Sequence, residues 1–152
     1  MNFKFDLFQF TVVGFILVFS CDTADESIVI VPDGYVGSIL IVYDQKYGLE
    51  ERYQDNKRVY VVPEDGILMS KFSDNDGIAR VPEFYYSGIE AKNRIDFVAE
   101  ASSLPMDQVV AHGGVVGSYK EIKFIQYFIG DSLKIFDSYN NDLIDLVIEK
   151  MN

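Results

Sequence analysis

From residue 28 onward the chain alternates short runs of β-branched and aromatic residues with turn residues. Runs of about four to eight such residues, bounded by Gly, Pro, Asn and Asp, are typical of strands. The pattern predicts strands over 28–31, 38–43, 51–54, 59–62, 67–72, 83–86, 94–99, 108–111, 115–119 and 123–129. The continuous apolar run 38–43 is expected of a central strand, and the polar segment 51–54 of an edge strand. The pattern therefore predicts a mainly β domain.

Two glycines separate the strands predicted over 108–111 and 115–119. Paired glycines accept the positive φ angles that tight hairpin turns require. We therefore expect these two strands to pair with each other across Gly113 and Gly114.

The last part of the chain has helical rather than strand-like spacing. Asp131 or Ser132 can cap a helix. Its apolar positions would be Leu133, Ile135 and Phe136. Further on, apolar residues recur at spacings of 3, 4 and 7, at Leu143, Ile144, Leu146, Val147 and Met151. This spacing predicts an amphipathic C-terminal helix that packs on the sheet.

The first 21 residues have a different pattern. A polar start with the single cation Lys4 precedes an apolar run over 7–19. This run matches the core of a signal peptide and is shorter than the ~20 residues needed to span a bilayer. It ends in Val18-Phe19-Ser20-Cys21, which places a small residue directly before the single cysteine of the chain. The pattern predicts a processing site at this block.

The block Val18 to Cys21 resembles the lipobox of a bacterial lipoprotein signal. The resemblance implies that residues 1–20 are removed by cleavage between Ser20 and Cys21. It also implies that Cys21 carries fatty acids such as palmitate and becomes the mature N-terminus. Each buried methylene contributes about 0.8 kcal/mol, so two or three acyl chains would hold a domain firmly on a membrane. A transmembrane anchor and a free thiol buried in an N-terminal helix are the alternatives.

Residues 21–27 comprise the cysteine and an acidic tether with Asp22, Asp25 and Glu26. Acidic residues directly after a lipidated cysteine resemble the surface-export signal of lipoproteins in the Bacteroidota. That resemblance implies an outer-membrane protein exposed at the cell surface, and a solvated spacer is the alternative. Residues 28–152 contain no internal repeat or low-complexity linker, so we expect a single domain there.

Composition and charge exclude several classes of protein. Apolar residues make up 49% of the chain, which is too many for a disordered protein. The net charge of −11 argues against nucleic acid as a partner and against electrostatic docking to anionic lipid, because both need clustered Lys and Arg. With Cys21 lipidated, the domain would have no thiol for a disulfide, so its core must stabilise it. No cofactor is predicted.

One histidine limits the possible catalytic chemistry. A Ser-His-Asp arrangement could use His112 with Ser118 or Ser102, but the chain has no G-x-S-x-G elbow. We expect His112 to be a turn residue beside Gly113. Two carboxylate pairs, Glu64-Asp65 and Glu50-Glu51, could suit a glycosidase, but neighbouring residues of a strand point to opposite faces.

A calcium site is a weak candidate at the loop that follows residue 72. Asp74, Asn75, Asp76 and Gly77 place hard oxygen ligands together. The EF-hand spacing would need an acid where Phe72 stands, and plain turns often have this composition. Aromatic residues offer a further option, either as an exposed face for a carbohydrate or protein partner or as the core of the fold. They are Tyr35, Tyr43, Tyr53, Tyr60, Phe84, Tyr85 and Tyr86.

Several turns and strands of the domain form a recognisable motif. It comprises Pro32, Gly34, Tyr35 and Gly37; the strand 39–43; Tyr53, Asp55 and Arg58; and Val62, Pro63, Glu64, Gly66, Ile67 and Leu68. The motif resembles an uncharacterised family of small Bacteroidota lipoproteins, a domain of unknown function. The resemblance supports an immunoglobulin- or transthyretin-like β-sandwich. It implies no activity, substrate or catalytic residues.

The sequence therefore favours a protein that is anchored in the cell envelope through acyl chains on Cys21. We expect its domain to have a non-catalytic binding or structural role. Two alternatives remain open: a small hydrolase that uses carboxylates, and an immunity or inhibitor lipoprotein whose acidic surface attracts a basic partner.

Overall fold

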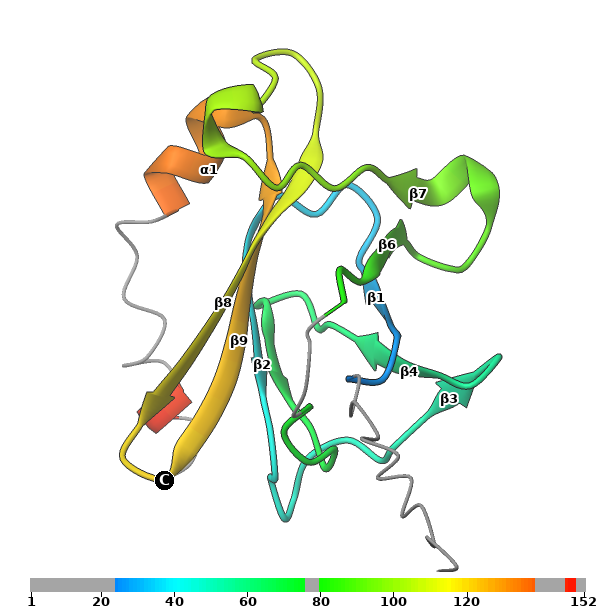
Figure 1. The fold of residues 1–152 in the computed structure, drawn as a ribbon, viewed down its shortest axis with the longest axis vertical. Coiled ribbons are helices and arrows are strands. Elements are labelled where there is room, and N and C mark those ends of the chain that lie inside the picture. Colours follow the sequence, from blue (N-terminus) through cyan, green and yellow to red (C-terminus); the bar gives the residue numbers. More distant parts are fainter. Residues whose placement is uncertain (1–23, 76–79, 139–146, 150–152) are drawn as a thin grey trace, which may run out of the picture.

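The computed structural model of the protein describes residues 24–75, 80–138 and 147–149. Within these ranges the chain forms two sheets, with the strand orders β3-β4-β1-β6-β7 and β5-β2-β9-β8 (Figure 1). The strands are β1 (Ser27–Val31), β2 (Gly37–Val42), β3 (Tyr53–Gln54), β4 (Lys57–Val61), β5 (Ile67–Met69), β6 (Glu83–Tyr86), β7 (Arg94–Ile95), β8 (Val110–Tyr119) and β9 (Ile122–Gly130). Short helices are η1 (Ala91–Asn93), η2 (Ala101–Ser103) and α1 (Ser132–Ser138). The predicted mainly β, sandwich-like fold with a C-terminal helical segment is confirmed.

The chain repeatedly passes from one sheet to the other. Strand β1 lies in the first sheet and β2 in the second; β3 and β4 return to the first, β5 to the second, and β6 and β7 to the first. Strands that return to a sheet after such a crossing can run in the same direction as the strand they left. Accordingly, β1 pairs in parallel with both β4 and β6, and β2 pairs in parallel with β5. The predicted edge position of the polar strand is confirmed, since β3 ends its sheet.

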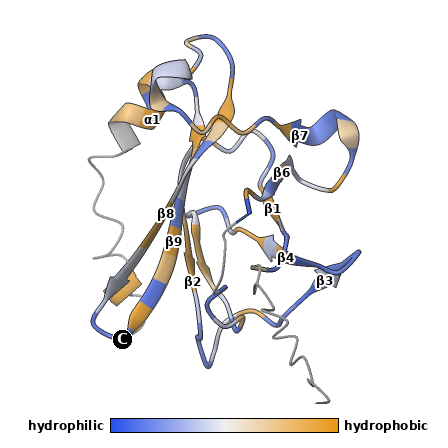
Figure 2. Ribbon diagram, viewed as in Figure 1, coloured by the Kyte–Doolittle hydropathy of each residue, from blue (hydrophilic) through white to orange (hydrophobic). Residues whose placement is uncertain are grey.

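The core lies between the two sheets. Alternate residues of β1 and β2, including Val29 and Ile39, point inward and are fully buried. Aromatic rings fill the space between them: the Phe84 ring centroid lies 5.1 Å from that of Tyr127 and 5.9 Å from that of Phe97. Hydrophobic residues accordingly follow the central strands, and hydrophilic residues follow β3 and the loops (Figure 2).

Strand β8 corrects the predicted hairpin across Gly113 and Gly114. Residues 110–119 form one continuous strand, which pairs antiparallel with β9. The register shifts between Gly113 and Val115, and both glycines have positive φ angles of 108° and 92°. The glycines therefore form a bulge in a long strand, a role that uses the same conformational freedom as a turn. The reversal lies farther along, between Tyr119 and Ile122.

The helical segment agrees with its predicted start. The Lys134 amide donates a hydrogen bond to Asp131 Oδ1 at 2.9 Å, so Asp131 caps α1. Ile135 is fully buried, whereas Leu133 and Phe136 are 67% and 52% exposed. Of the second predicted helix, residues 147–149 are described and helical, and Val147 packs against Leu40, Val42 and Ile67. Its other predicted apolar positions lie outside the described residues.

Candidate functional site: the docked N-terminal segment

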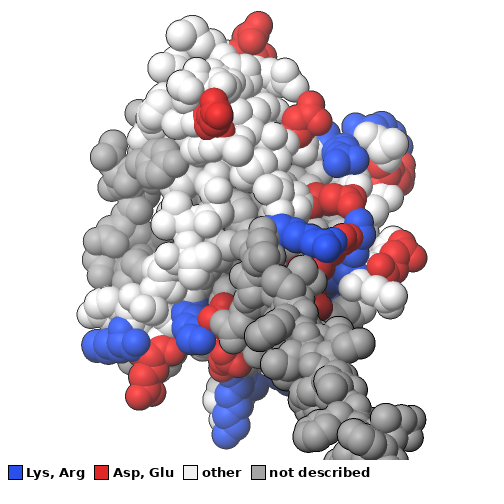
Figure 3. Space-filling view, viewed as in Figure 1, with Lys and Arg blue, Asp and Glu red and all other residues white. Residues whose placement is uncertain are grey.

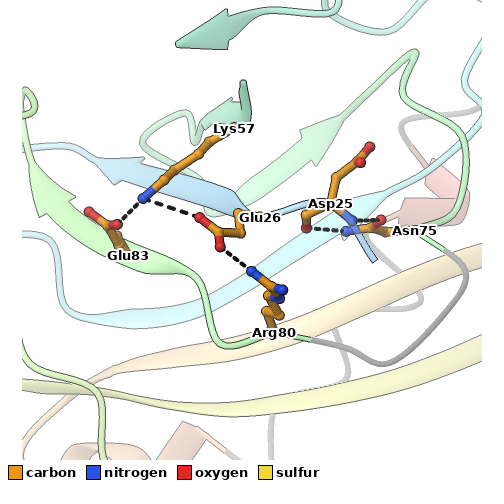
Figure 4. A network of polar contacts seen from close by, with 6 residues as sticks. All are labelled: Asp25, Glu26, Lys57, Asn75, Arg80 and Glu83. Carbon is orange, nitrogen blue, oxygen red and sulfur yellow. Dashed lines mark hydrogen bonds and ion pairs between the residues drawn. The ribbon is translucent and has the colours of Figure 1, made fainter. Parts of the chain in front are cut away.

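The N-terminal segment Ala24–Glu26, directly before β1, is packed onto the domain. Ala24 is only 4% exposed. The Asp25 amide donates to Asn75 Oδ1, and Asn75 Nδ2 donates to the Asp25 carbonyl, each at 2.9 Å (Figure 4). This reciprocal pair holds the segment against the loop that follows β5. Residues 24–26 of the predicted tether are thus in contact with the fold, and Ser27 belongs to β1.

Arg58 of β4 is the buried partner of this segment. Its Nε donates to Asp25 Oδ2 at 2.9 Å, and its Nη1 donates to the Ser73 carbonyl at 2.7 Å. The guanidinium carbon lies 5.1 Å from the ring centroid of Phe72, and the residue as a whole is 8% exposed. Its own amide donates to the Glu26 carbonyl at 2.9 Å. Arg58 therefore joins the segment, the loop and the core.

A second group of charges ties the segment to the outer face of the first sheet. Lys57 Nζ bonds to Glu83 and lies 3.5 Å from Glu26 Oε2, and Arg80 pairs with Glu26 (Figure 4). The Tyr85 hydroxyl donates to Glu83 Oε2 at 2.7 Å. The hydrogen bond from Lys57, followed by that from Tyr85, lowers the pKa of Glu83, and the bond to Glu83 in turn raises the pKa of Lys57.

We predict that Glu83→Gln weakens the dependence of stability on acid pH. The pKa of Glu83 is lower in the folded protein than its ordinary value of 4.5. Its contribution is therefore present above pH 4.5 and is lost as the pH falls through the folded value. The variant should be less stable than the wild type near neutral pH, and the two should converge in acid. Urea unfolding at several pH values measures this, with the exposed Glu64→Gln as control. A variant whose loss of stability is the same at every pH would contradict the prediction.

Two of the predicted calcium residues, Asp74 and Asn75, have side-chain contacts within the fold. Asp74 Oδ2 accepts a hydrogen bond from Lys123 Nζ at 2.8 Å, and the Asn75 side chain is bonded to Asp25. Asp76 lies outside the described residues, as do Ser20 and Cys21 of the predicted processing site. Within the described part of the chain, no group of three or more His, Cys, Asp or Glu side chains is placed to hold a metal ion.

His112 is a buried strand residue, which corrects the predicted turn position. It is 5% exposed in β8, and its Nδ1 lies 2.7 Å from the Val98 carbonyl oxygen. Ser118 lies six residues farther along the same strand, about 20 Å away at the rise of an extended chain. Ser102 belongs to η2. The structure therefore does not bring His112 and Ser118 together.

The carboxylate pairs and the aromatic residues have structural contacts. Asp65 Oδ1 accepts a hydrogen bond from the Ile67 amide at 3.1 Å, and the exposed Glu50 pairs with Lys71. Most of the predicted aromatic residues are buried or packed on a hydrophobic cluster, which confirms their core interpretation: Tyr35, Tyr43, Tyr60, Phe84, Tyr85 and Tyr86. Tyr53 is 56% exposed. Burial, followed by the charge of Asp65, raises the pKa of Tyr35 to about 12, and burial raises the pKa of Tyr43, Tyr60 and Tyr127.

Two cavities near the segment are small. One of about 50 Å³ lies beside Tyr43, Tyr60 and Tyr127. Another of about 260 Å³ lies beside Leu49, Val59 and Phe72 and is mainly apolar. Pockets that bury a drug-sized ligand are typically about 300–1,000 Å³. A third cavity, of about 460 Å³, lies beside Glu83, Arg94 and Asp96 and falls within this range.

Sequence reasoning missed the docked segment because its partners are remote. Asp25 and Arg58 are 33 positions apart, and Glu26 and Arg80 are 54 apart. From the sequence alone, acidic residues directly before a first strand are expected to be solvated, because their partners in the fold are not visible. One available signal is Arg58 itself, a charged residue within the turn motif that also contains Tyr53 and Asp55.

Comparisons with known proteins agree with the predicted resemblance to a family of unknown function. No curated protein matches this chain. One solved structure, a "Putative Lipoprotein from Bacillus anthracis", has 12% sequence identity and a TM-score of 0.49, over 80% of this chain and 81% of that chain. No helix among the described residues is both long and apolar enough to cross a membrane. The model of a family of unknown function (DUF6843) matches residues 23–133, well over half of the sequence, and the chain therefore belongs to that family.

Proposed function

We propose that the protein is a lipoprotein of the cell envelope, anchored through acyl chains on Cys21, whose domain has a non-catalytic binding or structural role. The observation that carries this proposal is the position of the processing site relative to the fold. The family match begins at residue 23, and Ala24 is already buried. The lipobox therefore ends where the folded domain begins, as expected if Cys21 is the mature N-terminus.

The surroundings of His112 and of the calcium candidate Asp74 support the non-catalytic part. His112 is held by the Val98 carbonyl, and Asp74 by Lys123. His112 and Ser118 also lie too far apart along β8 to act as a catalytic pair. The fold gives His112 and Asp74 a structural role.

An outer-membrane location in a member of the Bacteroidota is the finer part of the proposal. Its support is the resemblance of the acidic residues after Cys21 to a surface-export signal. Two of these acids, Asp25 and Glu26, also hold the N-terminal segment on the domain. Asp22, the third of these acids, lies outside the described residues.

Labelling with a fatty-acid analogue tests the anchor. We expect the wild-type protein to be labelled and to sediment with membranes, and Cys21→Ser to lose the label completely and to leave the membrane fraction. A matched control restores a thiol elsewhere, in the double variant Cys21→Ser with Ser102→Cys. This control should stay unlabelled, because acylation depends on the lipobox and not on an accessible thiol. Equal labelling of wild type and Cys21→Ser would overturn the proposal.

A further inference from the structure

Docking of residues 24–26 leaves very little chain between the proposed anchor and the folded domain. Three peptide units separate Cys21 from Ala24. Three extended residues span at most about 11 Å. The polar headgroup region of each leaflet is itself about 5–8 Å thick. A domain with its first residue so close to the acyl chains cannot stand away from the membrane.

Hydrogen bonds and an ion pair connect two loop tips of the domain to this segment. The Tyr43 amide donates to the Lys123 carbonyl at 3.0 Å, which places the end of β2 beside the start of β9. Lys123 in turn pairs with Asp74, whose neighbour Asn75 binds Asp25. The loop after β2 and the β8–β9 turn lie at the lower end of the molecule, and the N-terminal segment lies above them, beside β4 (Figure 1).

Each of the two tips presents an exposed tyrosine with a lysine over its ring. Tyr47 is 90% exposed, and Lys46 Nζ lies 5.2 Å from its ring centroid. Tyr119 is 40% exposed, and Lys120 Nζ lies 5.3 Å from its ring centroid. Tyrosine and lysine combine an apolar body with a polar tip, and they are the residues that settle at a membrane–water interface. Because Tyr47 is so exposed, its side chain contributes little to the hydrophobic core.

The charges around these tips indicate which kind of membrane surface they fit. Acidic and basic side chains are mixed at the lower end of the molecule, whereas few charges mark the upper part of the same face (Figure 3). The whole chain carries a net charge of −11. We therefore expect no general attraction of the domain to anionic lipid. We expect instead that the tyrosine rings insert among the polar headgroups.

We infer that the end of the domain that carries Tyr47 and Tyr119 rests on the headgroup surface of the membrane in which the protein is anchored. The docked segment sets the orientation, because it fixes the position of Ala24 on the domain. The inference rests on the proposed anchoring at Cys21. The occupant of this surface is a phospholipid headgroup layer rather than a second protein.

The absence of tryptophan from the chain makes a direct test possible. Tyr47→Trp and Tyr119→Trp each introduce one fluorescent probe at a loop tip. Met106→Trp is the matched control, because Met106 is 79% exposed and lies just before the start of β8. The start of β8 is about 30 Å from Tyr119 at the rise of a strand. The full chain is purified with its anchor and reconstituted in phosphatidylcholine vesicles that contain a lipid-bound quencher.

We expect both loop-tip variants to emit at shorter wavelength in vesicles and to be quenched by the lipid, at low and at high salt, while Met106→Trp is unaffected. Equal behaviour of the three variants, or quenching that high salt abolishes, would overturn the inference. The emission wavelength could instead shift with protein concentration in the absence of vesicles and change no further when vesicles are added. That result would assign this surface to a second copy of the chain and would also overturn the inference.

The mass of the purified chain separates this test from the test of the proposed function. Acyl chains on Cys21 support the anchor. If Cys21 is unmodified, the proposed function fails, and the free thiol is then coupled to a lipid with a maleimide headgroup. The same fluorescence comparison on this coupled protein supports or overturns the orientation by itself.

Discussion

Replacing Phe84 with alanine is expected to lower the free energy of unfolding by about 3–5 kcal/mol, the usual loss for removal of a buried phenylalanine. Phe84 is 1% exposed at the centre of the core. Its ring stacks on Phe97 and meets the edge of Tyr127. Because Phe84 lies in the first sheet and its partners come from the second sheet and the loop after β7, the cavity would lie where the sheets join and could not close without moving one of them.

Chemical denaturation followed by circular dichroism measures this loss. Phe136→Ala is the matched control, because it removes the same ring from α1 at a position that is 52% exposed. We expect the control to change stability by less than about 1 kcal/mol. Similar losses for the two variants would contradict the assignment of Phe84 to the core.

Arg58→Ala is expected to lower the free energy of unfolding by about 2–3 kcal/mol, the range for loss of charged hydrogen bonds at a largely buried site. The substitution removes the bonds to Asp25 and to the Ser73 carbonyl, and the contact with the Phe72 ring. Half of the Asp25 side chain is exposed, so water can solvate its carboxylate in the variant and limit the loss. The effect should concentrate in the N-terminal segment.

Hydrogen exchange of the Asp25 amide provides the local measurement. This amide bonds to Asn75 in the wild type. Its protection should fall in Arg58→Ala by more than that of the central strands. The control Lys71→Ala breaks the exposed pair with Glu50 and should change stability by no more than about 1 kcal/mol. An unchanged Asp25 amide in Arg58→Ala would show that Arg58 does not hold the segment.

The local elements of the fold were predictable because their signals are local. Alternation and turn residues located the strand 28–31, and the cap at Asp131 located the start of α1. The polar edge strand also followed from its own composition. Each of these predictions depends on residues within about one turn or one strand of each other, where side-chain pattern and backbone propensity act together.

The remaining features depend on pairings between distant segments. The parallel partners of β1 follow from crossings between sheets, which no run of hydrophobic residues reveals. The sequence predicts a turn at Gly113 and Gly114 because a bulge and a turn need the same positive φ, and the register with β9 alone distinguishes them. The sequence leaves Asp25 in either an export signal or a solvated spacer, because Arg58 and Asn75 reach it only in the folded chain.

The central claim is that Cys21 anchors a domain that begins almost at the lipid. Mass spectrometry of the N-terminal tryptic peptide of the protein from membranes tests it most directly. Lys46 is the first Lys or Arg after Cys21, so this peptide would cover residues 21–46. We predict a peptide that begins at Cys21 and carries acyl chains. An unmodified peptide that still contains residues 18–20 would contradict the account.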